Sequence, residues 1–392
     1  MLASLKIKNF RMLQDFQVSR LGHVNLIVGR NNSGKSTVLE ALRIFAGNAQ
    51  PALLQEIAAS HGEKFTIREE DASDADTIFP FEDFFTGRQF PEDDDAKIEI
   101  GEIGADHSRL LQIQHVFLVE EKKTVTDEQT GETRTRIMRR PVVPSRLERM
   151  EDEPVQPALL VTKGEQRLFP ITLEMTRPRY RTGARDADGT IPCSTIPTQF
   201  ISMDELAKEW DKVVFQDPQT TIIAAMQIIE PDFQNLTFVN DSTEEYRPPH
   251  FRRNPLRTPM VKMSGLSRPV SLNSLGDGML RVFQLVLKVF PAKGGFLLID
   301  EFENGLHYSV QEKIWTLLFK LSKDLNIQIF ATTHSWDCIE SFSRVAKQNT
   351  DTDGVLFRVG KSARQSNRGQ IIATVFDKEQ LYRITQSDVE VR

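Results

Sequence analysis

One stretch constrains this chain of 392 residues more than any other: Gly29-Arg30-Asn31-Asn32-Ser33-Gly34-Lys35-Ser36-Thr37. It follows an apolar run at 24–28 and precedes a segment with apolar residues at helical spacing. The pattern G-x-x-x-x-G-K-S between a strand and a helix is typical of a phosphate-binding P-loop. The chain is therefore expected to contain an α/β nucleotide-binding core.

The residue types in this stretch predict how a nucleoside triphosphate would be held. Gly29 and Gly34 allow backbone angles that let N–H groups face phosphate oxygens, and the helix N-terminus adds partial positive charge. Lys35 is placed to reach the β- and γ-phosphates, and the Ser36 hydroxyl to bind Mg²⁺. We predict a site for ATP and Mg²⁺ formed by all nine residues.

Composition limits the remaining classes. The chain is 39% hydrophobic and 27% charged, which fits one large or two moderate domains. No apolar run approaches the roughly 20 residues that span a bilayer, and the first residues lack a secretory core. Cys193 and Cys338 lie far apart and match no metal spacing. We expect a cytoplasmic protein without zinc or membrane contact. Because the net charge is −6, any contact with nucleic acid must come from a local basic patch.

Hydrophobic periodicity predicts the order of elements. An N-terminal hairpin is expected from strands at 5–10 and 16–19, and a β-rich region at about 97–200 with a hairpin at 124–140. Helices are expected at 203–214 and 220–229, with Ser202 or Asp204 capping the first, and a strand at 234–240. The last third predicts helices at 275–290, 308–323, 336–345 and 377–384 and strands at 295–300, 327–332, 354–359 and 370–376. Alternating helices and buried strands favour a largely parallel sheet with helices on its faces.

Two acids and a histidine end strands of this last third. Asp300 and Glu301 follow an apolar strand, where an aspartate beside a P-loop is the expected second anchor for Mg²⁺. A carboxylate at Glu301 can orient or deprotonate the water that attacks the γ-phosphate. His334 ends the next strand and can donate to that phosphate. His307 is read equally well as a site residue or a structural one.

A second anion-binding pattern precedes the helix at 275–290. Ser274, Gly276 and Gly278 lie at its predicted N-terminus, about 22 residues before the strand that carries Asp300. One active site does not need two phosphate cradles. The pattern indicates a site that is completed between two subunits.

The most basic segment runs from Arg247 to Arg268 and contains no acid. A nucleic-acid contact there would use the phosphate backbone, with Arg252, Arg253 and Arg257 as the candidate residues. The alternative is a basic loop that pairs with the protein's own acids or with nucleotide. Both interpretations are compatible with the sequence.

The combined motifs resemble the ABC-type ATPases of the SMC/RecF group, and most closely the OLD-like family. The matching pieces are "LKIKNFRML", "GRNNSGKST", "SLGDGM", "FLLIDEFENGLH" and "ATTHS". The resemblance implies a P-loop NTPase with the ABC-ATPase head architecture: an ATPase core at 1–48 and 265–392, an acidic loop and β-rich insertion at 49–200, and a helical lobe with a basic segment at 201–264.

The same resemblance implies roles for individual residues. Two ATP molecules would be sandwiched between two protomers, with Ser274, Gly276 and Gly278 of one closing on the γ-phosphate held by the other. Glu301 would be the catalytic base and His334 the switch histidine. Asp277 departs from the commoner L-S-G-G-Q signature, and Gln199 is the only candidate for a Q-loop glutamine.

Function follows from the resemblance only as an expectation. OLD nucleases continue into a TOPRIM domain, for which this sequence has no room, so the chain resembles stand-alone ATPases of bacterial anti-phage systems. Such an ATPase would form a homodimer or higher oligomer and control a separate nuclease or toxin. The alternative is a DNA-binding ATPase of RecF type in repair or maintenance. A transporter ATPase fits the N-terminal strands and the β-rich insertion poorly.

Overall fold

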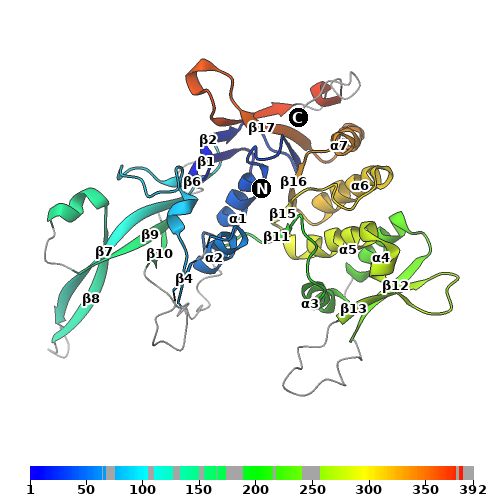
Figure 1. The fold of residues 1–392 in the computed structure, drawn as a ribbon, viewed down its shortest axis with the longest axis horizontal. Helices are drawn as coiled ribbons and strands as arrows, with labels where there is room; N and C mark the ends of the chain where they lie inside the picture. The colour runs from blue at the N-terminus through cyan, green and yellow to red at the C-terminus, as the bar shows by residue number, and fades with distance from the viewer. Residues whose placement is uncertain are drawn as a thin grey trace.

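The computed structural model shows two large sheets with a helix between them and a helical lobe to one side (Figure 1). It describes residues 1–392 apart from 64, 68–75, 105–109, 127–132, 150–153, 165, 174–188, 215–217, 241–256, 377–378 and 383–392. Among the described residues, no helix combines the length and apolarity needed to cross a bilayer.

The central sheet has six strands in the order β11-β15-β16-β3-β17-β18. They are β3 (Val24–Val28), β11 (Cys193–Ile196), β15 (Phe296–Ile299), β16 (Gln328–Thr333), β17 (Gly354–Lys361) and β18 (Ile371–Phe376). All neighbours are parallel except β17 and β18. The predicted largely parallel sheet is confirmed, and so is each of its predicted strands from the last third. β11 was not anticipated as a member, because its four residues are too few to show a pattern.

Apolar side chains bury both faces of this sheet. In β3 all five residues are buried, with Leu26 and Ile27 in separate hydrophobic clusters on opposite faces. One face packs on α1 (Lys35–Ala46), followed by α2 (Pro51–Ser60). The other packs on α5 (Asp277–Val289), α6 (Tyr308–Asp324) and α7 (Trp336–Gln348), close to their predicted positions.

The second sheet is antiparallel and combines the N-terminal hairpin with the β-rich region. Its strands are β1 (Leu5–Phe10), β2 (Leu13–Val18), β6 (Ile98–Gly101), β7 (Leu111–Thr126), β8 (Thr133–Val142), β9 (Val155–Lys163) and β10 (Gln166–Thr172). The hairpins β1–β2 and β7–β8 confirm the predicted pairs, although β2 begins three residues before the predicted strand. Pairing of β1 with β6, as in Ile7↔Ile100, joins segments 93 residues apart. Local periodicity carries no information on such a pairing.

The helical lobe contains α3 (Met203–Val213), α4 (Pro218–Ile229), β12 (Phe233–Asn240), β13 (Arg257–Met263) and β14 (Val270–Ser271). The Ser202 hydroxyl accepts the Glu205 N–H, so Ser202 is the cap of α3. Lys288 on α5 donates to Glu205 at 2.7 Å and Glu209 at 2.6 Å and ties α3 to α5. Two short strands, β4 (Phe65–Ile67) and β5 (Asp76–Ile78), pair with each other. Of the helix predicted at 377–384, residues 379–382 are helical and the rest lie outside the described residues.

Candidate nucleotide-binding and hydrolysis site

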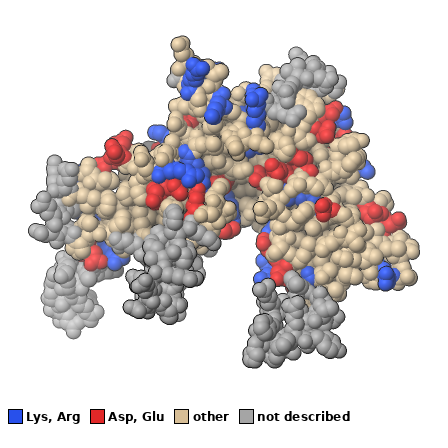
Figure 2. Space-filling model, in the orientation of Figure 1, with Lys and Arg blue, Asp and Glu red and all other residues tan. Residues whose placement is uncertain are grey.

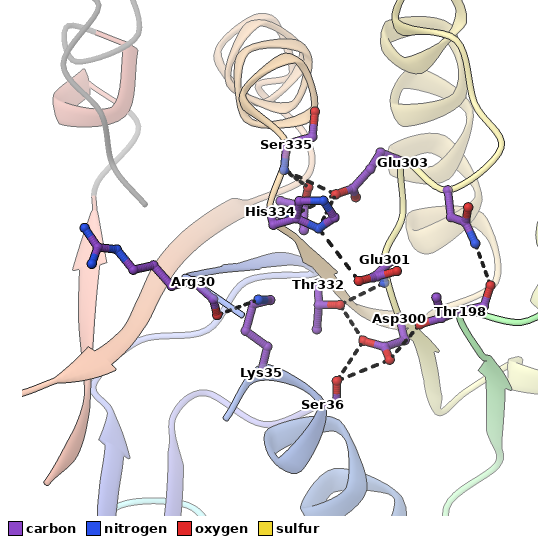
Figure 3. Close-up of polar contacts among 12 residues, drawn as sticks. Arg30, Lys35, Ser36, Thr198, Asp300, Glu301, Glu303, Thr332, His334 and Ser335 are labelled. Carbon is purple, nitrogen blue, oxygen red and sulfur yellow. Dashed lines mark hydrogen bonds and ion pairs between the residues drawn. The ribbon is translucent and has the colours of Figure 1, made fainter. Parts of the chain in front are cut away.

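The predicted site residues meet where four parallel strands end (Figure 3). β3 leads into the P-loop, β15 into Asp300 and Glu301, β16 into His334, and β11 into Thr198. Carboxyl ends of parallel strands lie at one edge of a sheet, so residues far apart in the chain are brought together there. This edge is the candidate active site.

The P-loop is built as the sequence predicts. Gly34 caps α1 with a φ of 102°, a conformation that favours glycine. A Cβ at Gly29 would lie 2.4 Å from the Val359 carbonyl oxygen, so a side chain has no space there. Lys35 Nζ donates to the Gly29 and Arg30 carbonyls at 2.8 and 3.0 Å. Burial lowers the pKa of Lys35, and three nearby acids oppose that effect. An anionic phosphate would be a stronger partner for this ammonium than neutral carbonyls.

The other loop residues differ in exposure. Arg30, Asn31, Asn32 and Ser36 are exposed, Thr37 is half-buried, and Ser33 is buried with no partner for its hydroxyl among the described residues. The first N–H groups of a helix have no partner within it. The loop therefore offers donors to an anion at the start of α1.

Ser36 and Asp300, the two residues predicted to bind Mg²⁺, are in hydrogen-bonding contact. Ser36 Oγ lies 3.2 Å from each carboxylate oxygen of Asp300. Asp300 also accepts the hydroxyl of Thr332 at 2.6 Å and that of Thr198 at 3.1 Å. Hydroxyl and carboxylate oxygens suit Mg²⁺, which takes few protein ligands when phosphates supply others. Bound there, the ion would neutralise charge on the phosphates.

Glu301 follows Asp300 in a left-handed conformation with a φ of 48°. Its N–H donates to Thr332 Oγ1 at 2.9 Å, and the same hydroxyl donates to Asp300. Thr332 is fully buried, so one hydroxyl fixes the two acids relative to each other. Thr332 lies within the motif "ATTHS", but the sequence pattern predicted no role for it.

His334 lies beside two glutamates, only one of which was predicted. Its Nδ1 is 3.7 Å from Glu301 Oε1 and 3.2 Å from Glu303 Oε1. Glu303 Oε1 also accepts the N–H groups of His334 and Ser335 at 3.0 and 3.2 Å. Glu303 was missed because its only sequence signal was a third acid two residues after Glu301.

Arg281 is the second residue that sequence reasoning missed. It lies on α5, is 1% exposed, and donates to the Pro197, Asp300 and Glu301 carbonyls at 2.9, 2.9 and 3.0 Å. Burial lowers the pKa of Arg281 to about 10, against the opposing charges of the three acids of the site. The available signal was an arginine inside the apolar run "MLRVFQLVL".

The predicted signature residues lie at the start of the helix that carries Arg281. Gly276, with a φ of 92°, precedes α5 and no side chain caps this end. The Ser274 hydroxyl donates to the Ser271 carbonyl at 2.6 Å, and a Cβ at Gly278 would lie 3.2 Å from the Gly305 carbonyl oxygen. In the described part of the chain no hydrogen bond joins these residues to the P-loop of the same protomer.

Two further candidates have defined positions. His307 precedes α6, where its Nδ1 accepts the Ser309 N–H, and its ring packs 4.3 Å from the Tyr308 ring. The structure therefore gives His307 a capping role. Gln199 is exposed and directly follows Thr198, whose hydroxyl contacts Asp300.

Of the three candidate arginines in the basic segment, only Arg257 lies among the described residues. Arg247, Arg252 and Arg253 lie outside the described residues. Arg257 forms a two-pronged ion pair with Asp211 on α3, at 2.5 and 2.9 Å, and lies 5.5 Å above the Phe238 ring. The structure thus gives Arg257 an acidic partner within its own chain, because β13 packs beside α3.

A pocket of about 600 Å³ adjoins the outer side of the P-loop. Besides residues 32–37 it is lined by Arg11, Met12, His61, Asp83 and Arg88. Glu63 organises its charges: both of its oxygens lie 3.0 Å from Arg11, and Arg88 is 3.5 Å away. A hydrogen bond with Glu40 raises the pKa of His61, against the effect of burial. Only the fold brings these segments to the P-loop.

Comparisons with known proteins agree with this site. Residues 1–181 match the family described as "AAA ATPase domain", and residues 221–337 match "AAA domain, putative AbiEii toxin, Type IV TA system". A Helicobacter pylori (strain ATCC 700392 / 26695) protein named ATP/GTP phosphatase is 23% identical over 89% of each chain. Shorter stretches match the OLD nuclease of Thermus scotoductus, 43% identical over 14% of this chain and 10% of that one, and the DNA double-strand break repair Rad50 ATPase of Archaeoglobus fulgidus, 42% identical over 14% and 6%.

These matches support an ABC-type ATPase of the SMC/RecF/OLD-like group. Its P-loop and the Asp300 strand lie on either side of β16 in one parallel sheet, with an antiparallel sheet packed over α1. Solved structures that align with this chain include an SMC head bound to the C-winged helix domain of ScpA, with 15% identity, coverage of 98% and 99%, and a TM-score of 0.48. The SMC head domain from Thermotoga maritima aligns with 14% identity, coverage of 96% and 99%, and a TM-score of 0.42.

Proposed function

We propose that this protein is an ATP-driven molecular switch. ATP binding would join two heads, and hydrolysis would separate them again. The observation that carries the proposal is the convergence of Lys35, Ser36, Asp300, Glu301 and His334 at one sheet edge (Figure 3). The set provides a phosphate clamp, a metal pair, a candidate base and a histidine for the γ-phosphate.

The position of the signature supports the proposed dimer. Ser274 and Gly276 are exposed at an uncapped helix N-terminus, which favours an anion. In the described chain they hydrogen-bond to no residue of their own P-loop. A second protomer that presents its γ-phosphate to this end would satisfy both features, and the same geometry would repeat by symmetry.

We further propose that the switch controls a separate effector, a nuclease or toxin, in bacterial anti-phage defence. Support comes from the family matched at 221–337, whose description names a putative toxin of a type IV toxin–antitoxin system, and from the stretch shared with an OLD nuclease. This assignment rests on relatedness.

Mixing two inactive variants tests the proposed ATP sandwich. Lys35→Ala removes the phosphate clamp of one protomer, and Ser274→Arg blocks its signature. A mixed dimer would combine the intact P-loop of one variant with the intact signature of the other. With random pairing we expect about one quarter of wild-type turnover, because half of the dimers would carry one working site of two. Phosphate release from an equimolar mixture measures this.

Each variant alone, at the same total concentration, is the control. Turnover of the mixture equal to the mean of the separate variants would show that each chain works alone. That result would remove the dimeric part of the proposal and leave the ATPase assignment in place.

A second function, nucleic-acid binding in DNA repair or maintenance, is favoured by the hairpin β17–β18. Figure 2 shows basic side chains gathered over this hairpin, at the top of the view. Arg358, Lys361, Arg364 and Arg368 are exposed, none has an ion-pair partner among the described residues, and no acid occurs from Gly354 to Phe376. The buried Ser362 orders the loop: its hydroxyl donates to Asn367 at 2.7 Å and accepts the Arg364 N–H at 3.2 Å.

Charge reversal of this hairpin tests the second function. If the hairpin contacts a phosphate backbone, the double substitution Arg364→Glu with Arg368→Glu should weaken binding of a DNA duplex. The slope of log K against the logarithm of the salt concentration should become shallower by about two. Fluorescence anisotropy at several salt concentrations measures both. The matched control is Lys313→Glu with Lys320→Glu, which reverses two exposed charges on α6. Equal losses in the two variants would mean a general charge effect and would contradict the assignment.

A further inference from the structure

We propose that Glu303 is a positioning residue of the hydrolytic reaction, which holds His334 by Nδ1 and keeps it away from Glu301. The inference rests on the proposed ATP hydrolysis and assigns a role to a residue that the motifs leave without one. Glu303 would leave Nε2 as the ring nitrogen available to the nucleotide. Glu301 would stay free to act on the attacking water.

The first observation is a competition between two carboxylates for one ring nitrogen (Figure 3). His334 Nδ1 lies 3.2 Å from Glu303 Oε1 and 3.7 Å from Glu301 Oε1. An ionised carboxylate only accepts hydrogen bonds, so a ring nitrogen that bonds to it must carry a proton. Which ring nitrogen is protonated is set by the partner of the other, and here Glu303 is the closer partner of Nδ1.

The second observation is that Glu303 also holds the backbone of the histidine. Its Oε1 accepts the N–H groups of His334 and Ser335, which directly precede α7. A carboxylate is favourable at this end of a helix. The backbone N–H of His334 is thus hydrogen-bonded to the same oxygen that lies 3.2 Å from its ring nitrogen Nδ1, so a turn of the ring toward Glu301 would give up this contact.

The third observation speaks against a purely structural role. Glu303 is 12% exposed, and its Oε2 has no hydrogen-bond partner among the described residues. Burial, followed by the charge of Glu303, raises the pKa of the neighbouring Cys338 thiol well above its usual range. A buried oxygen without a partner costs stability. Capping of α7 explains Oε1 and does not explain a second, unpaired oxygen at this position.

Glu303→Gln separates the two roles. The glutamine carbonyl can still accept the two backbone N–H groups, so the cap is kept while the negative charge that attracts Nδ1–H is removed. We expect kcat to fall by about 10- to 100-fold, with KM for ATP and the unfolding temperature close to wild type. Glu312→Gln, an exposed glutamate on α6 that lies 3.6 Å from Arg344, is the matched control and should leave kcat unchanged.

A double-mutant cycle shows whether Glu303 acts through the histidine. In a His334→Ala background, Glu303→Gln should change kcat by less than about twofold, because the group it positions is gone. Independent, multiplying losses would overturn the proposal. Glu303→Gln with unchanged kcat, or with a loss matched by a lowered unfolding temperature, would overturn it as well.

A spectroscopic readout keeps this test separate from the proposed function. Protein labelled with ¹⁵N-histidine should show His334 in the Nδ1–H form in the wild type and a changed tautomer in Glu303→Gln, while Glu312→Gln matches the wild type. His334→Ala assigns the signal. A wild type without ATPase activity but with this tautomer change would refute hydrolysis and keep the contact. An unchanged spectrum would refute the role of Glu303 whatever the activity.

Discussion

Glu301→Gln is expected to reduce ATP hydrolysis by at least about 100-fold while ATP still binds. The amide cannot take a proton from the attacking water, and it has nearly the same size as the carboxylate. The backbone of Glu301 is held by its own N–H to Thr332 and by its carbonyl, which Arg281 contacts, so the left-handed conformation does not depend on the side chain. The side chain is 34% exposed, and the change creates no cavity. Phosphate release and calorimetric titration with ATP measure the two quantities.

The matched control for this experiment is Glu312→Gln on α6, outside the site. Its turnover should equal that of the wild type. Unchanged turnover in Glu301→Gln would contradict the assignment of the base. Loss of ATP binding together with turnover would instead show that Glu301 holds nucleotide.

Arg281→Met is expected to have the largest effect on folding stability, a loss of about 3–5 kcal/mol. Methionine keeps much of the volume but leaves the carbonyls of Pro197, Asp300 and Glu301 without their donor. The Asp300 and Glu301 carbonyls follow β15, and the Pro197 carbonyl follows β11. Repulsion between these carbonyls would loosen the backbone that positions the two acids. Three nearby carboxylates would also lose an opposing charge that α5 supplies. Urea denaturation followed by circular dichroism measures the change.

Arg344→Met is the control for a lost guanidinium. Arg344 is 47% exposed on α7 and pairs with Glu312 and Glu340 on the surface, where an ion pair contributes about 0–1 kcal/mol. Similar losses in both variants would mean that burial and the three carbonyl bonds of Arg281 contribute nothing specific. The larger loss should also be accompanied by reduced turnover, because α5 joins the signature end to Glu301.

Local sequence patterns were sufficient for most elements of the core. The P-loop, the strand before Asp300 and the helices α5, α6 and α7 were predicted within a few residues, because apolar side chains repeat there at the period of their element. The same patterns missed β11, which has only four residues, and the pairing of β1 with β6. Short strands and long-range pairings leave no period in the sequence.

The catalytic motifs were readable for a similar reason. Phosphate binding needs particular residue types at fixed spacing, so the pattern identifies Gly34, Lys35 and Ser36. The position of Asp300 at the end of a buried strand identifies it in the same way. Their supporting residues do not. Thr332, Arg281 and Glu303 belong to common types in ordinary positions, and their roles depend on which carbonyl, hydroxyl or ring the fold brings within about 3 Å.

The sequence by itself determined the candidate residues for the chemistry: a P-loop, two residues predicted to bind Mg²⁺, a candidate base and a histidine, each identified by local spacing. Only the tertiary structure decided how these groups are held. The parallel order of the strands brings the carboxyl ends of four strands to one edge of the sheet. There Thr332 links Asp300 to Glu301, and Arg281 connects them to the signature helix. The tertiary structure also pairs Arg257 with Asp211 and gathers exposed basic side chains on the β17–β18 hairpin. Hydrogen bonds and ion pairs depend on distance in space, which a linear pattern does not encode.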